Sequence, residues 1–131
     1  MDKHYKILLV EDEDAVREMY KLILSKQGYE VDTAIDGEEA VHKLTRGEPD
    51  YTVVLLDIML PKMDGVSVLK QMRADNSPSK QLPVFVLTNL GQEDLINEAK
   101  QLGVKDYWIK ASLFPTDLVS HLEEFFQSLG K

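Results

Sequence analysis

The sequence predicts an α/β fold in which five parallel strands alternate with five helices, a doubly wound (βα)5 arrangement. Short apolar runs such as ILLV, VVLL and VFVL have the length of single strands. Segments with apolar residues at helical spacing separate these runs. Strands that are apolar on both faces and joined by helices are typical of a parallel sheet covered on both sides. We expect one domain over residues 1–131, with its core at about residues 6–129, because 131 residues suit a single hydrophobic core.

The first half of the chain contains two strand–helix units. A strand is predicted at about Lys6 to Val10, and a second at YEVDTA, residues 29–34. The helix between them has its apolar residues on one face: Ala15, Val16, Met19, Tyr20, Ile23 and Leu24. Asp36 and Glu39 have the spacing of a capping box and indicate the start of the next helix, which Gly47 ends.

The second half repeats the alternation three times. The predicted strands are YTVVLL at residues 51–56, VFVL after Pro83, and DYWI at residues 106–109. Asp64 is the expected N-cap of the helix after the first of them. Apolar residues at helical spacing mark the three helices: Val68, Leu69 and Met72, then Leu95, Ala99 and Leu102, then Leu118, Val119, Leu122, Phe125 and Phe126.

The composition excludes several classes of function. Fifteen basic and 23 acidic residues give a net charge of −8, which disfavours direct binding to nucleic acid or anionic membranes. No apolar run approaches the roughly 18 residues of a membrane span, and the N-terminus lacks the pattern of a signal peptide. The absence of cysteine excludes disulfides and thiol chemistry and fits a cytoplasmic location.

The residues that follow the predicted strands carry the chemistry. Ligands bind beyond the carboxyl ends of the strands in open α/β sheets. Glu11 and Asp12 follow the first strand, and the third strand ends on Asp57. The fourth strand leads to Thr88 and the fifth to Lys110. Each alone has an ordinary explanation as a loop acid, a cap or a surface lysine. Their joint placement predicts one site.

Charge balance suggests a metal at this site. Three carboxylates at close range repel one another unless they are compensated. A divalent cation and the Lys110 ammonium together supply the three positive charges that balance them. Oxygen ligands favour Mg²⁺, Mn²⁺ or Ca²⁺ over zinc, and a site with room for water and a phosphate suits Mg²⁺ best.

Asp57 is then a candidate nucleophile. A carboxylate can accept a phosphoryl group as an aspartyl phosphate, and phosphoryl transfer mainly requires positioning and charge neutralisation. We expect Lys110 to pair with one phosphoryl oxygen and Thr88 to donate a hydrogen bond to another.

These residues resemble those of the CheY-like receiver domains of two-component response regulators. The matching segments are LLVEDED, LLDIMLPKMDG, VFVLTN and DYWIK, and the resemblance extends from Lys6 to about Leu129. The D-x-x-x-P-x-x-D-G spacing of Asp57, Pro61, Asp64 and Gly65 is specific when combined with the acidic pair, the threonine and the lysine. The resemblance implies a flavodoxin-like sheet in the strand order 2-1-3-4-5.

The resemblance implies a role for each site residue. Asp57 corresponds to the phosphoacceptor, Asp12 to a direct metal ligand and Glu11 to a ligand that acts mostly through water. The backbone carbonyl of Met59 is a further implied metal ligand. The other implied roles are a switch hydroxyl, a phosphoryl-binding lysine and an aromatic residue whose rotamer reports activation: Thr88, Lys110 and Tyr107.

The implied function is a signalling switch and not a turnover enzyme. A histidine kinase or phosphotransfer protein donates the phosphoryl group, and the domain promotes its own phosphorylation and dephosphorylation. An output partner or a second copy of the chain reads the face formed by the helix near residues 94–102, the fifth strand and the last helix. The native-looking start and the polar end favour a stand-alone regulator over a fragment of a longer protein.

Two positions depart from the family pattern, and a third carries a bulky residue. Ala111 stands where a proline usually follows the lysine, and a cis peptide bond there would cost about 3 kcal/mol, so we expect a trans bond and a shifted loop. Asn89 replaces the usual small residue after Thr88. Met59 is bulky, and residues at the corresponding position tune dephosphorylation in the family that the chain resembles.

Three other functions are alternatives. An aspartate-nucleophile phosphatase usually has a second acid two residues after the nucleophile, where this chain has Met59. A flavodoxin-like FMN carrier requires a phosphate-binding loop after the first strand, and the EDED sequence there repels phosphate. A pseudo-receiver signals without phosphorylation, and the complete acidic set argues against it.

Overall fold

Five parallel strands form the centre of the structure, a computed structural model that describes residues 4–129. The strand order is β2-β1-β3-β4-β5, which confirms the predicted order and the predicted α/β fold. The strands are β1 (Lys6–Val10), β2 (Glu30–Ala34), β3 (Val53–Asp57), β4 (Val84–Thr88) and β5 (Asp106–Ile109). The helices are α1 (Asp14–Lys26), α2 (Gly37–Thr45), α3 (Gly65–Met72), α4 (Glu93–Gln101) and α5 (Pro115–Leu129), with a short 3-10 turn η1 at Lys110–Ser112.

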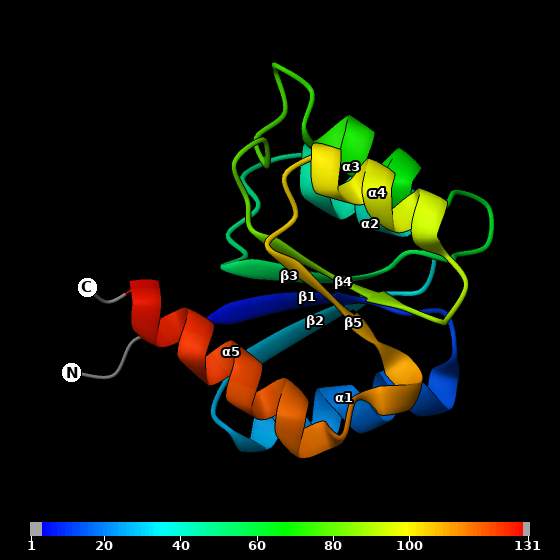
Figure 1. Cartoon of the computed structure of the whole chain (residues 1–131). Helices are drawn as coiled ribbons and strands as arrows, with labels where there is room; N and C mark the ends of the chain where they lie inside the picture. Colours follow the sequence, from blue (N-terminus) through cyan, green and yellow to red (C-terminus); the bar gives the residue numbers. More distant parts are fainter. Residues whose placement is uncertain (1–3, 130–131) are drawn as a thin grey trace.

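The helices cover both faces of the sheet. Helices α1 and α5 lie on one face, and α2, α3 and α4 lie on the other (Figure 1). Along β1, Ile7 and Leu9 belong to the core beneath α1 and α5, whereas Leu8 and Val10 belong to the core beneath α2 to α4. Because both faces are covered, the central strands β3 and β4 are buried at every residue. In residues 4–129, no helix has both the length and the hydrophobicity to cross a bilayer.

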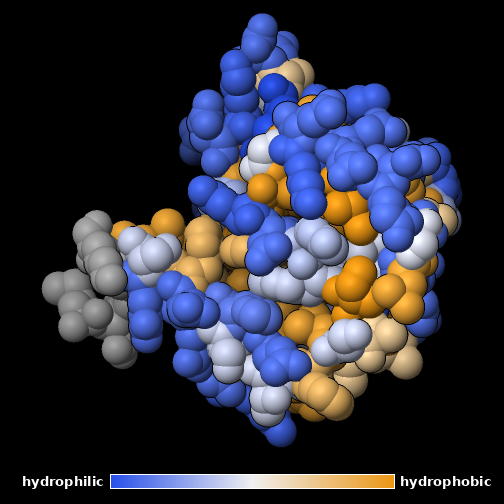
Figure 2. Space-filling view, viewed as in Figure 1, coloured by the Kyte–Doolittle hydropathy of each residue, from blue (hydrophilic) through white to orange (hydrophobic). Residues whose placement is uncertain are grey.

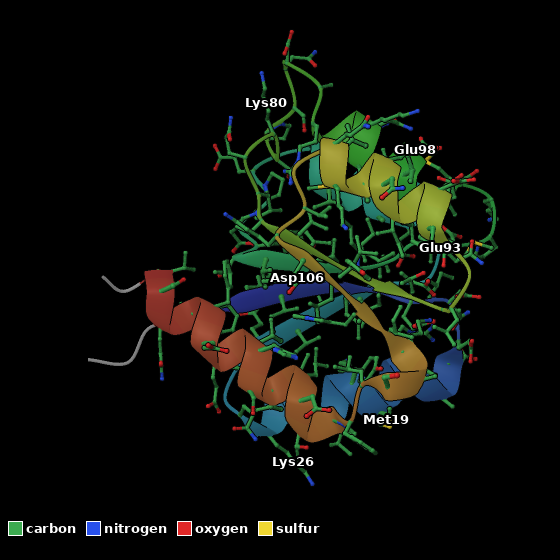
Figure 3. The ribbon with its side chains drawn as sticks, viewed as in Figure 1. Met19, Lys26, Lys80, Glu93, Glu98 and Asp106 are labelled. Atoms are coloured by element: carbon green, nitrogen blue, oxygen red, sulfur yellow. The ribbon has the colours of Figure 1, made fainter. Side chains whose placement is uncertain are left out.

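Helix α1 differs from the predicted apolar face. Ala15 is exposed, and Met19, labelled in Figure 3, is 42% exposed. The buried positions are Arg17, Tyr20 and Leu24. Arg17 occupies the apolar face because its guanidinium donates a hydrogen bond of 3.0 Å to the Glu11 carbonyl oxygen.

The predicted caps are confirmed. The Asp36 carboxylate accepts from the Glu39 amide at 2.8 Å, and the Asp64 carboxylate accepts from the Ser67 amide at 2.8 Å. The return bond of the predicted capping box differs, because the Glu39 carboxylate accepts from Ile35 N at 3.2 Å and not from the N-cap amide. These bonds satisfy amides that have no partner within the helix.

Strand β5 carries an aromatic stack that joins it to α5. The Trp108 ring is stacked on Phe85 of β4 at 4.7 Å and on His121 of α5 at 4.8 Å between centroids. Phe125 contacts Phe85 edge-on at 5.2 Å. Trp108 is therefore a core residue, as predicted, and the stack fixes the packing of α5 on the edge of the sheet.

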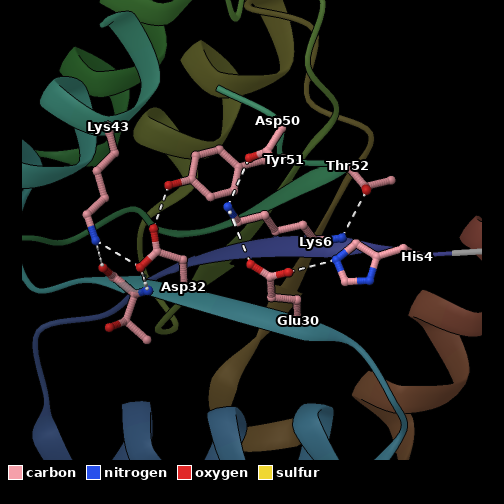
Figure 4. Close-up of polar contacts among 9 residues, drawn as sticks. His4, Lys6, Glu30, Asp32, Lys43, Asp50, Tyr51 and Thr52 are labelled. Carbon is pink, nitrogen blue, oxygen red and sulfur yellow. Dashed lines mark hydrogen bonds and ion pairs between the residues drawn. The ribbon is translucent and has the colours of Figure 1, made fainter. Parts of the chain in front are cut away.

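A polar network closes the β2 edge of the sheet (Figure 4). The Tyr51 hydroxyl donates to Asp32 at 2.6 Å, and Lys43 Nζ donates to Asp32 at 2.9 Å and to the Thr33 carbonyl at 2.6 Å. Burial opposes the ionised form of Asp32, but the hydrogen bonds from Tyr51 and Lys43 outweigh it and lower the pKa of Asp32. The network ties β2 to α2 and to the segment before β3.

Replacement of Tyr51 tests the contribution of this network. Tyr51→Phe should lower the free energy of unfolding by about 1 kcal/mol, because a hydrogen bond to a partly buried carboxylate is lost. Chemical denaturation at neutral pH measures the change. Tyr29→Phe is the matched control, since the hydroxyl of Tyr29 makes no hydrogen bond to the residues described. Equal losses in the two variants would contradict a role for the network.

Candidate functional site

Lys110 brings two carboxylates together at the carboxyl ends of the strands. Lys110 Nζ lies 2.7 Å from Glu11 Oε1 and 2.7 Å from Asp57 Oδ2. Glu11 is fully buried and Asp57 is 2% exposed. Glu11 follows β1, Asp57 ends β3 and Lys110 follows β5. The predicted strand order therefore brings the three residues together at the carboxyl ends of the strands.

Asp12 completes an acidic cluster at these strand ends. One carboxylate oxygen from each of Glu11, Asp12 and Asp57 lies within 4.8 Å of the other two. Asp12 is exposed, so the cluster opens to solvent on its side. The backbone of the acidic segment is held by Arg17, whose Nη1 lies 3.0 Å from the Glu11 carbonyl oxygen and 3.4 Å from that of Asp12.

The Asp57 carboxylate is oriented by two donors. Met59 N donates to Oδ1 at 3.0 Å, and Lys110 Nζ donates to Oδ2 at 2.7 Å. Asp57 is the last residue of β3, as the sequence predicts. The orientation of the carboxylate is therefore set both by the strand and by the loop that follows it.

The Asp64–Gly65 pair shapes that loop. Gly65 N donates to the Ile58 carbonyl oxygen at 2.9 Å. A Cβ atom on Gly65 would lie 2.7 Å from Ile58 Cα and 2.9 Å from the Asp57 carbonyl oxygen. Only glycine fits this close approach, and the chain just before it adopts a positive φ of 67° at Lys62. The loop thus folds back directly against Asp57.

Thr88 and Tyr107 lie near the site without bonding to it. The buried Thr88 hydroxyl donates to the Asn89 carbonyl oxygen at 3.1 Å, and no hydrogen bond within residues 4–129 joins it to Asp57 or Lys110. Tyr107 is half-buried, and Lys100 Nζ of α4 lies 5.0 Å from the centre of its ring. Residues Met59 and Asn89 are exposed at the rim.

Burial dominates the electrostatics of the cluster. It raises the pKa of Glu11 and of Asp57, although the contact with Lys110 opposes the rise in both. Burial also opposes the charged form of Lys110, but its contacts with Asp57 and Glu11 outweigh that and raise the pKa of Lys110. The ammonium therefore stays charged, and the carboxylates are under-compensated.

The donor set fits a hard divalent cation. The three carboxylates and one ammonium leave two negative charges. Glu11 Oε1 is buried and accepts no hydrogen bond from the residues described, although Lys110 Nζ lies close to it. Carboxylate oxygens alone suit Mg²⁺ or Mn²⁺ rather than zinc. A cation would supply the missing charge.

The loop after Lys110 has no cis peptide. The structure contains none in residues 4–129, so the Lys110–Ala111 bond is trans, as expected for a non-proline residue. The 3-10 turn η1 leads from β5 to α5.

Arg17 is the site residue that the sequence analysis missed. Its signal is a basic residue three and seven positions before Tyr20 and Leu24, on the buried face of a helix. An arginine on a buried face requires acceptors, and the carbonyl oxygens of the acidic segment are the nearest ones.

Comparison with known proteins gives consistent relatives. A family model described as response regulator receiver domain matches residues 7–123. The chemotaxis protein CheY of Treponema pallidum is 37% identical over 107 residues, which cover 81% of this chain and 72% of CheY. The transcriptional regulatory protein SrrA of Staphylococcus aureus is 38% identical over 105 residues, which cover 80% of this chain but only 41% of SrrA.

Solved structures agree with the sequence relatives. The chemotaxis response regulator CheY4 of Vibrio cholerae has a TM-score of 0.81 and 30% identity, with 93% of this chain and 98% of CheY4 covered. The receiver domain of the sensor histidine kinase PA1611 of Pseudomonas aeruginosa has a TM-score of 0.79 and 29% identity, with 93% and 97% covered. The PA1611 structure has a magnesium ion coordinated in its active site cleft.

The acidic cluster predicts a pH-dependent stabilisation by Mg²⁺. The raised pKa values of Glu11 and Asp57 mean that the stability they contribute is present below about pH 4 and is lost as the pH rises through their folded-state pKa values. Bound Mg²⁺ should restore it, because a metal competes with protons for the carboxylates. We expect Mg²⁺ to raise the melting temperature near pH 8 and to have little effect near pH 4.

Two variants locate this effect. Mg²⁺ at 100 times its Kd should add about 2.7 kcal/mol to the wild type, and Asp12→Asn should remove most of that gain. Glu13→Gln removes the same charge from an exposed residue of the same segment and should keep the gain in stability from Mg²⁺. An unchanged melting temperature of the wild type in millimolar Mg²⁺ at pH 8 would rule out the metal site.

Proposed function

The chain belongs to the response regulator receiver domain family, and from this premise we propose that it is a phosphorylation-activated switch with Asp57 as phosphoacceptor. The observation that supports this assignment most strongly is the Asp57–Lys110 ion pair. The buried Asp57 carboxylate lies 2.7 Å from the Lys110 ammonium at the carboxyl ends of the strands. We also propose that residues 1–131 form a single receiver domain with its core at about residues 6–129.

The geometry of Asp57 suits attack on phosphorus. Each carboxylate oxygen accepts one hydrogen bond, from Met59 N or from Lys110, and so keeps a second lone pair for bonding. An Asp57 O–P bond forms as the bond from phosphorus to the donor breaks. Lys110 stays beside the transferred group and stabilises the charge on its oxygens. The donor is a histidine kinase or a phosphotransfer protein.

Mg²⁺ is the cofactor that we propose, with Mn²⁺ as a substitute. The residues that would hold it are Asp12 and Asp57 directly, Glu11 mostly through water, and the Met59 backbone carbonyl. When bound, the ion neutralises charge on the carboxylates and on the phosphoryl oxygens. The acidic cluster of this chain and the magnesium ion in the related PA1611 receiver support the proposal.

The same site argues for a switch over a phosphatase. A phosphatase of the aspartate-nucleophile class would need an acid two residues after Asp57, and the exposed Met59 occupies that position. The role of the chain is therefore to carry the modification and signal, while its own residues promote phosphorylation and dephosphorylation. A pseudo-receiver would not need the buried Glu11–Lys110–Asp57 arrangement.

We assign the switch to Thr88 and Tyr107. An aspartyl phosphate adds charge and acceptor oxygens, so the Thr88 hydroxyl should leave the Asn89 carbonyl and donate to one of them. The space that it vacates beside β4 admits the Tyr107 ring, which now lies beside Lys100. Packed cores change between discrete arrangements, so this small movement can alter a whole face.

The face affected is formed by α4, β5 and α5. Figure 2 shows apolar side chains among hydrophilic ones on this side of the molecule. Leu90 and Phe114, in the loops after β4 and β5, are 75% and 71% exposed. We propose that an output protein, or a second copy of the chain in its phosphorylated form, binds here.

Intact mass spectrometry tests the acceptor. Incubation with Mg²⁺ and a small acyl phosphate should add one phosphoryl group to the wild type. Asp57→Asn should remove the addition, because an amide is no nucleophile, and Asp75→Asn, an exposed control, should keep it. Modification of the Asp57→Asn variant would place the acceptor elsewhere.

NMR with beryllofluoride, a phosphoryl mimic, tests the switch. Amide shifts should extend from the loops around Asp57 to Tyr107 and α5. Thr88→Ala should confine them to the loops, because the relay hydroxyl is gone, whereas the exposed Thr116→Ala should leave them unchanged. A wild type in which Tyr107 and α5 stay silent would refute the proposed switch.

A further inference from the structure

A basic cavity lies at the end of the sheet opposite to Asp57. Its volume is about 410 Å³, and it opens between the loop after α3 and the connection from α4 to β5. Figure 3 shows Lys80 on that loop, above the connection. Pro83 and Lys105, which line the cavity, immediately precede β4 and β5, whereas the acidic site lies where the strands end. The cavity is therefore separate from the acidic site.

One of the cations that line this cavity is Arg73. Arg73 Nε donates to the Leu102 carbonyl oxygen at 3.0 Å, and Nη1 donates to those of Leu82 at 2.6 Å and Lys80 at 3.0 Å. All these acceptors are uncharged. No carboxylate of residues 4–129 forms an ion pair with Arg73.

The positive charge of Arg73 is thus held in a half-buried place without a counter-charge. Burial opposes the charged form of Arg73 and lowers its pKa. The second terminal nitrogen, Nη2, donates no hydrogen bond to any residue in the described part of the chain, and this atom is not buried. Two donor hydrogens therefore remain for a ligand.

Two lysines extend the positive charge. Lys105 is exposed and makes no ion pair among the residues described, and Lys80 pairs only with the exposed Asp75 at 2.8 Å. Gln81 and Gln101 add amide donors to the lining. Three cations around one cavity are a local reversal of sign on a chain of net charge −8, and such a patch attracts anions.

We propose that this cavity binds a small phosphorylated molecule, with a diphosphate as its minimal ligand. A planar guanidinium with a free terminal nitrogen, flanked by two ammonium groups, matches the several oxygens of a diphosphate better than one carboxylate. The volume lies within the range of about 300–1,000 Å³ for small-molecule sites.

Occupancy would stabilise a junction between elements. Arg73 is the C-cap of α3, and its guanidinium is bonded to the loop before β4 and to Leu102 at the end of α4. An anion that binds beside this guanidinium supplies the counter-charge that the half-buried Arg73 lacks. The bonds from Arg73 to Leu82 and Leu102 then form at a lower cost in free energy. The bound ligand therefore favours the present position of α4 over displaced ones.

An NMR titration with sodium pyrophosphate in Mg²⁺-free buffer tests the site. We expect saturable amide shifts at Gln81, Gly103 and Lys105, with no matching shifts from sodium chloride at equal ionic strength. The Lys80→Gln/Lys105→Gln variant should weaken binding at least tenfold. The Lys21→Gln/Lys26→Gln variant removes the same charge from the exposed surface of α1 and should bind as the wild type does.

The outcomes separate the alternatives. Shifts that do not saturate, or that persist at equal affinity in the Lys80→Gln/Lys105→Gln variant, would overturn the proposal. The spectrum of each variant without ligand verifies its fold. A second titration with ADP distinguishes the source of the phosphate groups: tighter binding than pyrophosphate indicates a nucleotide, and equal binding indicates recognition of the phosphates alone.

Discussion

The structure depends on the confinement of like charges at the carboxyl ends of the strands in a parallel sheet. The carboxylates of Glu11 and Asp12 follow β1 and that of Asp57 ends β3, and one ammonium from the end of β5 reaches two of the three. In the strand order, β4 lies between β3 and β5, so the Lys110 side chain must pass over the end of β4. The small Thr88 ends that strand, fully buried. The identity of each strand end is thus constrained by its neighbours as well as by its own chemistry.

Local patterns were sufficient to predict most of the fold. The caps at Asp36 and Asp64 and the apolar strands were predictable because their causes lie within a few residues. The buried face of α1 was not, because Arg17 is buried by acceptors on a preceding loop rather than by its own hydrophobicity. Likewise, the residue types of the acidic site were predictable, but the Thr88 hydroxyl bond to its neighbouring carbonyl depends on the rotamer that the folded protein selects.

Gly65 shows how a short motif acts on a distant group. Its missing side chain lets the loop after β3 approach the backbone of Asp57 and Ile58, and the same loop supplies the Met59 amide to the Asp57 carboxylate. A larger residue would displace the loop and with it one of the two donors that orient the carboxylate. The glycine is therefore required for packing, and this packing orients the Asp57 carboxylate. A different loop, the turn after Lys110, forms with a trans peptide bond to Ala111.

The aromatic stack on β5 has an optical consequence. The chain contains one tryptophan, and that residue lies between Phe85 and His121, next in sequence to Tyr107. Its fluorescence consequently comes from a single place, the junction of β4, β5 and α5. Any rearrangement of that junction alters the surroundings of the only indole in the molecule. The protein thus carries an intrinsic emission probe, and changes on this face can be followed in time without attaching a dye.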